Sequence, residues 1–218
     1  MDRSEVIEGY MKVPTGNICD AMDQLGIPIG VILGLNPISP TQKRAVGYAL
    51  TIKQMERHQT AEGKGLAKHS KVIDDEISYG DMLVIDVNGR KDVCTGGSIL
   101  AKRAKLRGAS GYVINGCLRD VREIAEMDFP VHLVGSTPVK SSPHLQTIGI
   151  NIPIEINGVQ IIPGDLIVTD DTGIVVIPER YIERVLKIAL EINEKENQIN
   201  KMISDGISFA DAVSKTRL

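Results

Sequence analysis

Two short segments of the sequence combine residue types that suit an anionic ligand. The first, Cys94-Thr95-Gly96-Gly97-Ser98-Ile99-Leu100, follows the apolar run Met82–Val87 and leads into a helical pattern. Glycines let the backbone turn sharply and approach a ligand closely. The first N–H groups of a helix have no partner within it and lie at its positive end, so they suit a carboxylate or phosphate. Ser98 has a simpler interpretation as the cap of that helix.

The second segment places an arginine beside an aspartate. Asn115-Gly116-Cys117-Leu118-Arg119-Asp120 follows a predicted strand and begins the next helix. The Arg119 guanidinium offers a fork of N–H donors to a substrate carboxylate. Asp120 suits a hard cation such as Mg²⁺, which retains several waters when the protein supplies few ligands. Without further context, an Arg-Asp pair of this kind is more often an exposed ion pair than a binding site.

A scaffold of alternating strands and helices must position these segments. The spacing predicts strands over Met82–Val87, Gly111–Ile114 and Val131–Val134, with helices over Gly97–Arg107 and Arg119–Glu126 between them. This alternation predicts parallel βαβ units. Ligands bind at the carboxyl ends of the strands in such sheets, and both segments lie there.

The flanking regions predict a more varied set of elements. Upstream we expect a helix over Thr15–Leu25, a loop over 27–40, a strand over Ala45–Met55 and a helix over Gly65–Ile77. Downstream, two hairpins are expected: Ile152–Ile156 with Val159–Ile162 around Asn157-Gly158, and Leu166–Thr169 with Ile174–Ile177 around residues 170–173. The sequence therefore predicts an α/β fold that mixes parallel strands with antiparallel hairpins.

A long helix is predicted from Glu179 to about Asp205, after Pro178 and before Gly206. Apolar residues recur along it in alternate steps of three and four, which is typical of a helix that packs along one face. These residues are Ile182, Val185, Ala189, Ile192, Ile199 and Ile203. Glu196 interrupts this apolar seam. Its carboxylate is either solvated, because the seam rotates away, or placed on a contact surface to serve a metal or a partner's site.

Composition limits the classes of function. The formal charge of −3 and the pI of about 5.8 argue against general binding to nucleic acid. Three cysteines without CxxC spacing support neither a disulfide framework nor a cysteine zinc site. The sequence has no signal peptide and no apolar run long enough to cross a membrane. We therefore expect a cytoplasmic protein that binds neither membranes nor nucleic acid.

Taken together, these motifs resemble the RraA-like family, which includes the class II pyruvate aldolases. The aldolases carry an Asp followed, at a fixed spacing, by Arg-Asp, and residues 99–118 preserve that spacing here between Ser98 and Arg119-Asp120. The resemblance covers nearly the whole chain, through Asp20-Ala21-Met22, Leu25-Gly26, residues 80–86, Phe129-Pro130-Val131, Thr137-Pro138, Pro163-Gly164-Asp165 and residues 170–173.

The resemblance implies a single domain over residues 1–218 with a swivelling β/β/α sandwich, assembled as homotrimers or homohexamers. It also implies an active site shared between subunits. The turn at Gly97 and Ser98, the amides of Ile99 and Leu100, and the Arg119 side chain would hold a pyruvyl group. Asp120 would bind Mg²⁺. Glu196, on the helix over 179–205 that packs on a neighbouring subunit, would help to hold the metal's waters.

The implied function is a Mg²⁺-dependent lyase that acts on a 2-oxo acid. The reactions are aldol cleavage of a 4-hydroxy-2-oxo acid to release pyruvate, and decarboxylation of oxaloacetate. Ser98 stands where the aldolases have an acid, and a hydroxyl is a poor base near neutral pH, so we expect slow aldol cleavage. Ser98, Arg119 and Asp120 are the catalytic candidates. The alternative is a non-catalytic protein that regulates a ribonuclease, as other members of the family do.

Overall fold

The computed structural model describes residues 1–58 and 69–216. Its helices are α1 (Arg3–Tyr10), α2 (Thr15–Gln24), α3 (His69–Asp75), α4 (Ser98–Leu106), α5 (Val121–Glu126), a 3₁₀ turn (Glu179–Tyr181), α6 (Ile182–Ser204) and α7 (Phe209–Thr216). Its strands are β1 (Gly30–Ile32), β2 (Asn36–Pro37), β3 (Ala45–Glu56), β4 (Asp81–Asp86), β5 (Cys94–Gly96), β6 (Gly111–Leu118), β7 (Val131–Ser136), β8 (Leu145–Ile150), β9 (Ile154–Ile156), β10 (Val159–Ile161), β11 (Leu166–Thr169) and β12 (Ile174–Ile177).

A mixed sheet of 10 strands forms the centre of the fold, and its main order is β1-β12-β11-β3-β4-β6-β7-β2. Strands β3, β4, β6 and β7 pair in that order and run parallel to one another, and β5 also pairs parallel with β6. Strand β8 pairs antiparallel with β3. The predicted βαβ units and both predicted hairpins are confirmed, and with them the mixed α/β fold.

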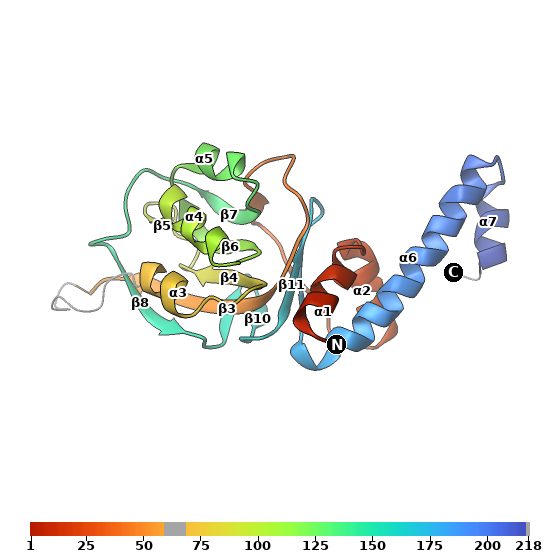
Figure 1. Cartoon of the computed structure of the whole chain (residues 1–218), viewed down its shortest axis with the longest axis horizontal. Helices are drawn as coiled ribbons and strands as arrows, with labels where there is room; N and C mark the ends of the chain where they lie inside the picture. The colour runs from red at the N-terminus through yellow and green to blue at the C-terminus, as the bar shows by residue number, and fades with distance from the viewer. Residues whose placement is uncertain (59–68, 217–218) are drawn as a thin grey trace.

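The two faces of the parallel strands are covered differently. Leu83 and Ile85 of β4 belong to the core beneath α3, α4 and α5, whereas Met82 and Val84 belong to a core that includes the β9–β10 hairpin. Figure 1 shows the three helices on one side of these strands. This alternation along β4 is the ordinary consequence of the pleat, and it gives the sheet one face covered by helices and one covered by a hairpin.

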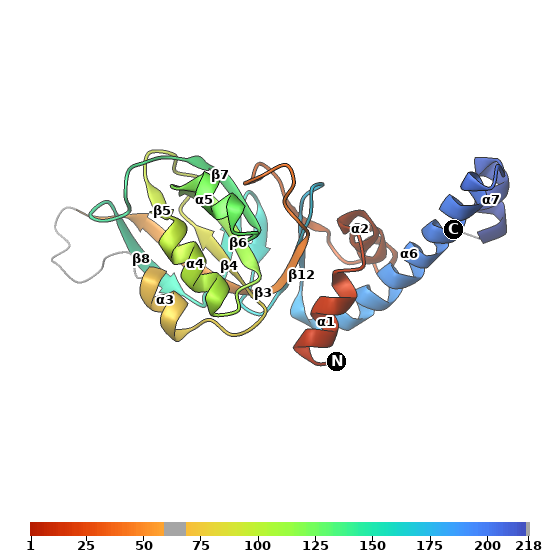
Figure 2. The same ribbon diagram turned by 45° about the horizontal axis from the view of Figure 1, so that its top comes forward.

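Helices α1, α2, α6 and α7 form an arm beside the sheet. Figures 1 and 2 both show α6 leading away from the sheet, with α7 folded back at its far end. The Tyr10 hydroxyl donates to the Ile182 carbonyl oxygen at 2.8 Å. Val185, Ala189 and Ile192 are buried, in a core shared with α1 and α2. The first half of the seam predicted on this helix therefore packs within the chain itself, and Ile203 near its end is 42% exposed.

Several predicted boundaries were wrong. Residues 27–40, predicted as a loop, contain β1 and β2, and the strand predicted over Gly111–Ile114 extends to Leu118. The helix predicted from Arg119 begins at Val121, because Asp120 takes a left-handed conformation with φ 56°. Helices α1 and α7 and strands β5 and β8 were not predicted. The helix predicted over Gly65–Ile77 corresponds in part to α3, while residues 65–68 lie outside the described residues.

Candidate functional site

The carboxyl end of β6 delivers two of the predicted site residues, Arg119 and Asp120. The Arg119 backbone N–H donates to the Gly96 carbonyl oxygen at 3.1 Å, which fastens the end of β6 to the end of β5. Asp120 follows with its positive φ at the N-cap position of α5, but its side chain does not cap that helix. The turn between β6 and α5 is therefore shaped to present both side chains toward β5 and α4.

The Asp120 carboxylate lies at the N-terminus of α4 instead. Its Oδ2 accepts hydrogen bonds from the Ser98 backbone N–H at 3.2 Å and from the Ser98 hydroxyl at 3.3 Å. The N-cap of α4 is Gly97, which has no side chain to perform this role. The interpretation of Ser98 as the helix cap was wrong: Ser98 is the first helical residue, and a carboxylate from the next βα turn satisfies its N–H.

Gly97 is required by the closeness of this arrangement. A Cβ at Gly97 would lie 2.5 Å from Asp120 Oδ2 and 2.8 Å from Arg119 Cγ. Contacts below about 3 Å are sterically forbidden, so any side chain at Gly97 would displace one of the two residues. The Arg119 and Asp120 side chains thus pack directly against the backbone of Gly97.

A cavity of about 120 Å³ lies next to Gly97, Arg119 and Asp120. Its lining includes the predicted residues Gly97, Ile99, Leu100, Arg119 and Asp120, together with Cys94, Lys140 and Ser141. Arg119 and Lys140 outnumber the one carboxylate, Asp120, so the charged side chains at the cavity favour an anion. The first-turn N–H groups of α4 add to this preference, because they are not paired within the helix.

The Arg119 and Asp120 side chains also line a second hollow, of about 400 Å³, with Ser136, Thr137 and Pro138. The Arg119 Nε lies 3.6 Å from Asp120 Oδ2, and the two side chains are 45% and 34% exposed. The pair therefore stands between two open spaces rather than at the end of a closed one. A ligand held at Arg119 has room to extend in either direction.

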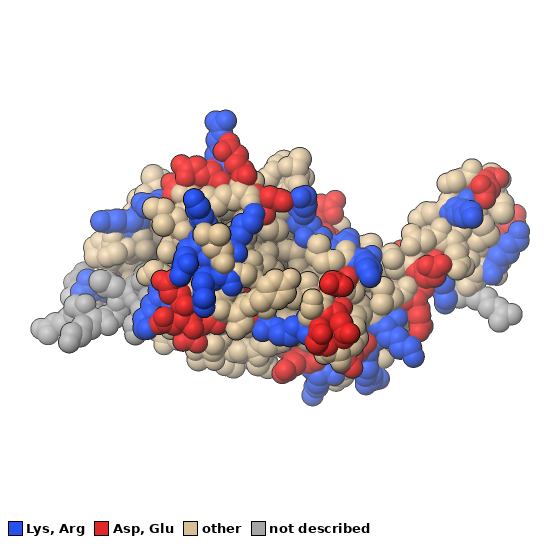
Figure 3. All heavy atoms as spheres, viewed as in Figure 1, with Lys and Arg blue, Asp and Glu red and all other residues tan. Residues whose placement is uncertain are grey.

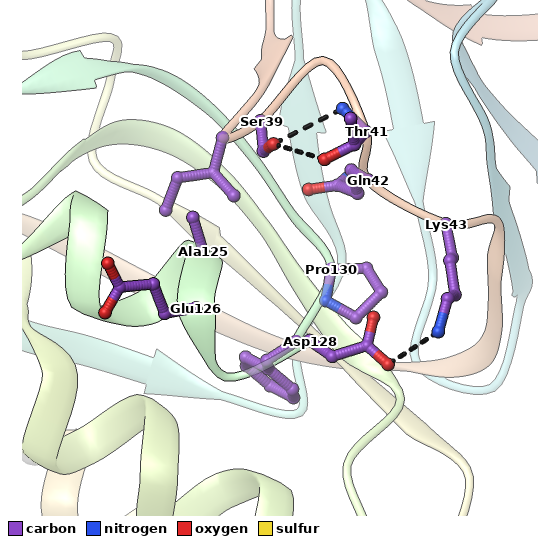
Figure 4. A pocket seen from close by; sticks show the side chains of 10 residues that line it. Ser39, Thr41, Gln42, Lys43, Ala125, Glu126, Asp128 and Pro130 are labelled. Carbon is purple, nitrogen blue, oxygen red and sulfur yellow. Dashed lines mark hydrogen bonds and ion pairs between the residues drawn. The ribbon is translucent and has the colours of Figure 1, made fainter.

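A separate pocket, of about 120 Å³, lies at the other end of α5. Figure 4 shows two of its polar contacts: the Ser39 hydroxyl is bonded to Thr41, and the Lys43 ammonium to Asp128, at 2.8 Å for the second pair. None of the predicted site residues lines it. We therefore place the candidate active site at Arg119 and Asp120 and not here.

The donor set at the candidate site fits a hydrated Mg²⁺ ion. Asp120 uses Oδ2 to bind Ser98, so Oδ1 remains available on a side chain that is partly exposed to the cavity. Among the described residues, no group of three His, Cys, Asp or Glu side chains is arranged to hold a metal. Mg²⁺ often binds through one or two carboxylates and several waters, so a lone carboxylate in an open cavity is consistent with it.

Glu196, the other predicted metal ligand, lies elsewhere in the chain. It is a half-buried residue of α6, and its Oε2 accepts a hydrogen bond from the Asn17 side chain of α2 at 2.7 Å. Helix α6 lies apart from α4 and α5 in both views (Figures 1 and 2). The structure thus brings Gly97, Ser98, Ile99, Leu100, Arg119 and Asp120 together, and does not bring Glu196 to them within one chain.

Sequence reasoning missed Lys140 as a lining residue of the cavity, whereas Cys94, another lining residue, begins the first segment that it singled out. Lys140 had a weak signal, since it follows the Thr137-Pro138 motif by two residues. Burial raises the pKa of the Cys94 thiol and the Arg119 guanidinium opposes that rise. Residues 141–146 were expected to form a loop that could cover a site; Ser141 of this segment lines the cavity, and His144 does not.

The surface and the helices place few other constraints on function. Figure 3 shows acidic and basic side chains interspersed over the viewed face, with lysines and arginines gathered near α4. No helix within the described residues is both long enough and apolar enough to cross a membrane.

Comparison with known proteins identifies the family. The RraA-like family model, described as Aldolase/RraA, matches residues 15–176. A Halalkalibacterium halodurans protein named "Putative 4-hydroxy-4-methyl-2-oxoglutarate aldolase" is 34% identical over 209 residues, which are 95% of this chain and 93% of that protein. Protein DlpA of Legionella pneumophila is 32% identical over 208 residues, but the chain spans only 33% of its length.

Solved structures show the same relationship in three dimensions. The crystal structure of Streptomyces coelicolor RraAS2, described as an unusual member of the RNase ES inhibitor RraA protein family, superposes with a TM-score of 0.78 at 26% identity. The match covers 90% of this chain and 96% of that one. An uncharacterized protein from Pseudomonas syringae pv. tomato matches over 96% of both chains, with a TM-score of 0.83 at 27% identity.

Proposed function

Because the chain belongs to the RraA-like family, we propose that it is a metal-dependent carbon–carbon lyase acting on a small 2-oxo acid. The observation that carries the proposal is the placement of Arg119 and Asp120 against the N-terminus of α4, beside a cavity whose charges favour an anion. The aldolase name of a relative that matches 95% of the chain supports the same reaction class.

In this proposal the chain's own groups hold the substrate at both of its oxygen-bearing ends. The first-turn amides of α4 at Ile99 and Leu100 receive the carboxylate, and the Arg119 guanidinium donates to the 2-oxo oxygen or to the carboxylate. Breaking a carbon–carbon bond next to a ketone leaves an enolate, whose negative charge develops on that oxygen. Donors that are already oriented toward it lower the barrier, by about 3–4 kcal/mol for one good donor.

Mg²⁺ held by Asp120 would act as a Lewis acid toward the 2-oxo group. Ser98 keeps Asp120 oriented through its backbone N–H and hydroxyl. The Ser98 hydroxyl can hold a water molecule by hydrogen bonding, but it is a poor base near neutral pH. Cleavage of a 4-hydroxy acid requires removal of a hydroxyl proton, whereas decarboxylation of oxaloacetate does not. We therefore infer that oxaloacetate decarboxylation suffers less from the serine than aldol cleavage does.

We further propose that the site is completed by a second copy of the chain, in a homotrimer or homohexamer. Ile99, at the edge of the cavity, leaves 79% of its surface exposed and is therefore available to contact a neighbouring subunit. Glu196 is held in place by Asn17 on an arm that cannot reach Asp120 in its own chain. A neighbour's α6 seated on this edge would cover Ile99 and supply Glu196.

The test is a screen for pyruvate release from 4-hydroxy-2-oxo acids and from oxaloacetate, with Mg²⁺ and with a chelator. We expect Mg²⁺-dependent decarboxylation and slower aldol cleavage in the purified chain, and neither in an Arg119→Ala, Asp120→Asn double variant. Turnover that persists in the double variant would show that the chemistry occurs elsewhere.

A second candidate function is regulation of a ribonuclease without catalysis. It is favoured by the likeness to Streptomyces coelicolor RraAS2, which is described within a family of ribonuclease inhibitors. A pull-down with a purified endoribonuclease of this class distinguishes the two. Capture that is unchanged by Asp120→Asn, together with no turnover on any 2-oxo acid, would favour the regulatory function.

A further inference from the structure

A second polar site lies at the carboxyl ends of the parallel strands, on the face opposite α4. Lys53, Asp86 and Asn115 are direct neighbours across β3, β4 and β6. The residues that precede them pack into the core on the helix side: Ile52, Ile85 and Ile114. Because side chains alternate along a strand, the polar row points to the face that carries the β9–β10 hairpin. The candidate lyase site lies on the other side of the sheet, at the N-terminus of α4.

The row is organised around a buried ion pair. Asp86 is 1% exposed, and its carboxylate accepts hydrogen bonds from the Lys53 ammonium, from the Asn115 side chain at 2.8 Å and from the Asn88 backbone N–H at 2.8 Å. The ammonium also donates to the Asn88 side-chain oxygen at 2.5 Å. Lys53 thus lies between two oxygen groups and supplies a positive charge to both. The site has its own cation and needs none from solution.

The row opens into a pocket of about 710 Å³. Its opposite wall is apolar and consists of Ile152, Pro153 and Ile154. The Thr51 hydroxyl donates to the Ile152 carbonyl oxygen at 2.6 Å, which fixes this wall to β3. Glu155 and Gln160, which are cross-strand partners in the hairpin, bring a carboxylate and an amide to the rim. The volume lies within the range of about 300–1,000 Å³ that is typical of small-molecule sites.

Several hydrogen-bonding groups at this pocket have unused capacity. Within the part of the chain that the structure describes, the side chains of Glu155 and Gln160 have no hydrogen-bond partner, and the Asn88 amide uses only its oxygen. The Lys53 ammonium has two of its three N–H groups engaged. The free groups are therefore both donors and acceptors, gathered opposite an apolar wall.

The charges at the pocket decide the class of ligand. Lys53 and Asp86 neutralise each other, and Glu155 leaves one net negative charge, so carboxylates and phosphates are disfavoured. Hydroxyl groups both donate and accept, and they match a mixed set of amide, carboxylate and ammonium groups. We propose that this pocket binds an uncharged polyhydroxylated molecule, such as a polyol or a monosaccharide, with its C–H face on residues 152–154. This preference is opposite to that of the candidate lyase site, whose charges favour an anion.

The experiment is saturation-transfer NMR on the purified, assembled protein with sorbitol, myo-inositol and D-glucose as probes. We expect saturation of at least one probe in the wild type, and at least about fivefold weaker binding in Gln160→Leu and in Asn88→Gly, since each removes one hydrogen-bonding group. Asn88 has φ 56°, a conformation that glycine adopts freely, so Asn88→Gly preserves the turn. Gln198→Leu, at an exposed glutamine of α6, is the matched control and should bind as the wild type does.

Competition separates this site from the proposed lyase site. Pyruvate with Mg²⁺ should leave the probe's saturation unchanged, and Arg119→Ala should bind the probe normally even if it loses all turnover. The proposal is overturned if no probe is saturated, if Gln160→Leu and Asn88→Gly bind as tightly as Gln198→Leu, or if pyruvate displaces the probe. None of these outcomes depends on whether the chain is a lyase.

Discussion

The Asp120 carboxylate accepts hydrogen bonds from both the backbone N–H and the hydroxyl of Ser98. Asp120 lies in the turn between β6 and α5, whereas Ser98 is the first residue of α4. One side chain therefore joins the ends of α4 and α5. Because the Arg119 backbone is bonded at the same time to Gly96, the N-terminus of α4, Arg119 and Asp120 are joined into one unit. The predictions for this unit follow from what each bond contributes.

Removing the charged groups should separate binding from catalysis. Asp120→Asn keeps a residue that tolerates the left-handed conformation and should abolish metal-dependent turnover while the fold persists.

Arg119→Ala should lower kcat/KM by about 30–1,000-fold, since a lost charged hydrogen bond costs about 2–4 kcal/mol. Steady-state kinetics and Mg²⁺ titration by calorimetry measure the two effects. Wild-type turnover in both variants would contradict the assigned site.

Ser98→Asp should restore a general base where the aldolases have an acid. The new carboxylate would lie beside Asp120, and repulsion between like charges raises the pKa of one of them. We expect aldol cleavage to rise by about 100-fold, the usual contribution of a positioned acid or base, with a smaller change in oxaloacetate decarboxylation. Ser98→Asn is the uncharged control. If Ser98→Asp lowers both rates, the serine is matched to a different substrate.

Gly97→Ala should inactivate the site without unfolding the chain. The added methyl group would displace Asp120 or Arg119, because its Cβ would lie 2.5 Å from one and 2.8 Å from a carbon of the other. Gly16→Ala is the matched control, since a Cβ there meets nothing within 4 Å. In the helix α2, alanine should stabilise the chain by up to about 1 kcal/mol. Full activity in Gly97→Ala would show that Arg119 and Asp120 can shift without loss of function.

Mixed oligomers test whether the site is shared. Asp120→Asn and Glu196→Gln should each be inactive alone. Co-expressed in equal amounts, they should recover about a quarter of the wild-type activity, because a site needs an intact Asp120 from one chain and an intact Glu196 from its neighbour. Light scattering should show a trimer or hexamer. A monomer of 23.7 kDa, or no recovery on mixing, would contradict the shared site.

Stability should fall in mild acid because of buried histidines. Burial lowers the pKa of His69 from 6.5 to about 4 and also lowers the pKa of His132. The unfolded chain therefore binds more protons than the folded chain between pH 6.5 and about pH 4, and the free energy of unfolding decreases as the pH falls through this window, by up to about 1.4 kcal/mol per pH unit for His69. The free energy of unfolding, measured with urea at several pH values in this range, should depend less steeply on pH in His69→Asn than in the wild type. His144→Asn, at an exposed position, is the control, and an unchanged slope in His69→Asn would refute the assignment.

The sequence predicted the strand and helix pattern well where local periodicity decides it. The hairpins and the parallel units are of this kind, as are the turn at Gly97 and the Arg119-Asp120 pair. It could not predict that Asp120 binds the N-terminus of α4, because that bond depends on the register between β5 and β6. The hydrogen bond between Asn17 and Glu196 could not be predicted either, because it joins residues far apart in the chain. Helix α1 was missed because its apolar residues show little helical periodicity, whereas α7 is amphipathic and its pattern was overlooked.

The contact between Gly97 and Asp120 also makes the order of evolutionary change at this site matter. While the carboxylate is present, a side chain at residue 97 would force Asp120 or Arg119 to move, so substitutions there would disturb the site. A lineage that first loses the carboxylate frees this position, and any larger residue acquired later then blocks the return of the acid. Loss of the carboxylate by that route would be difficult to reverse.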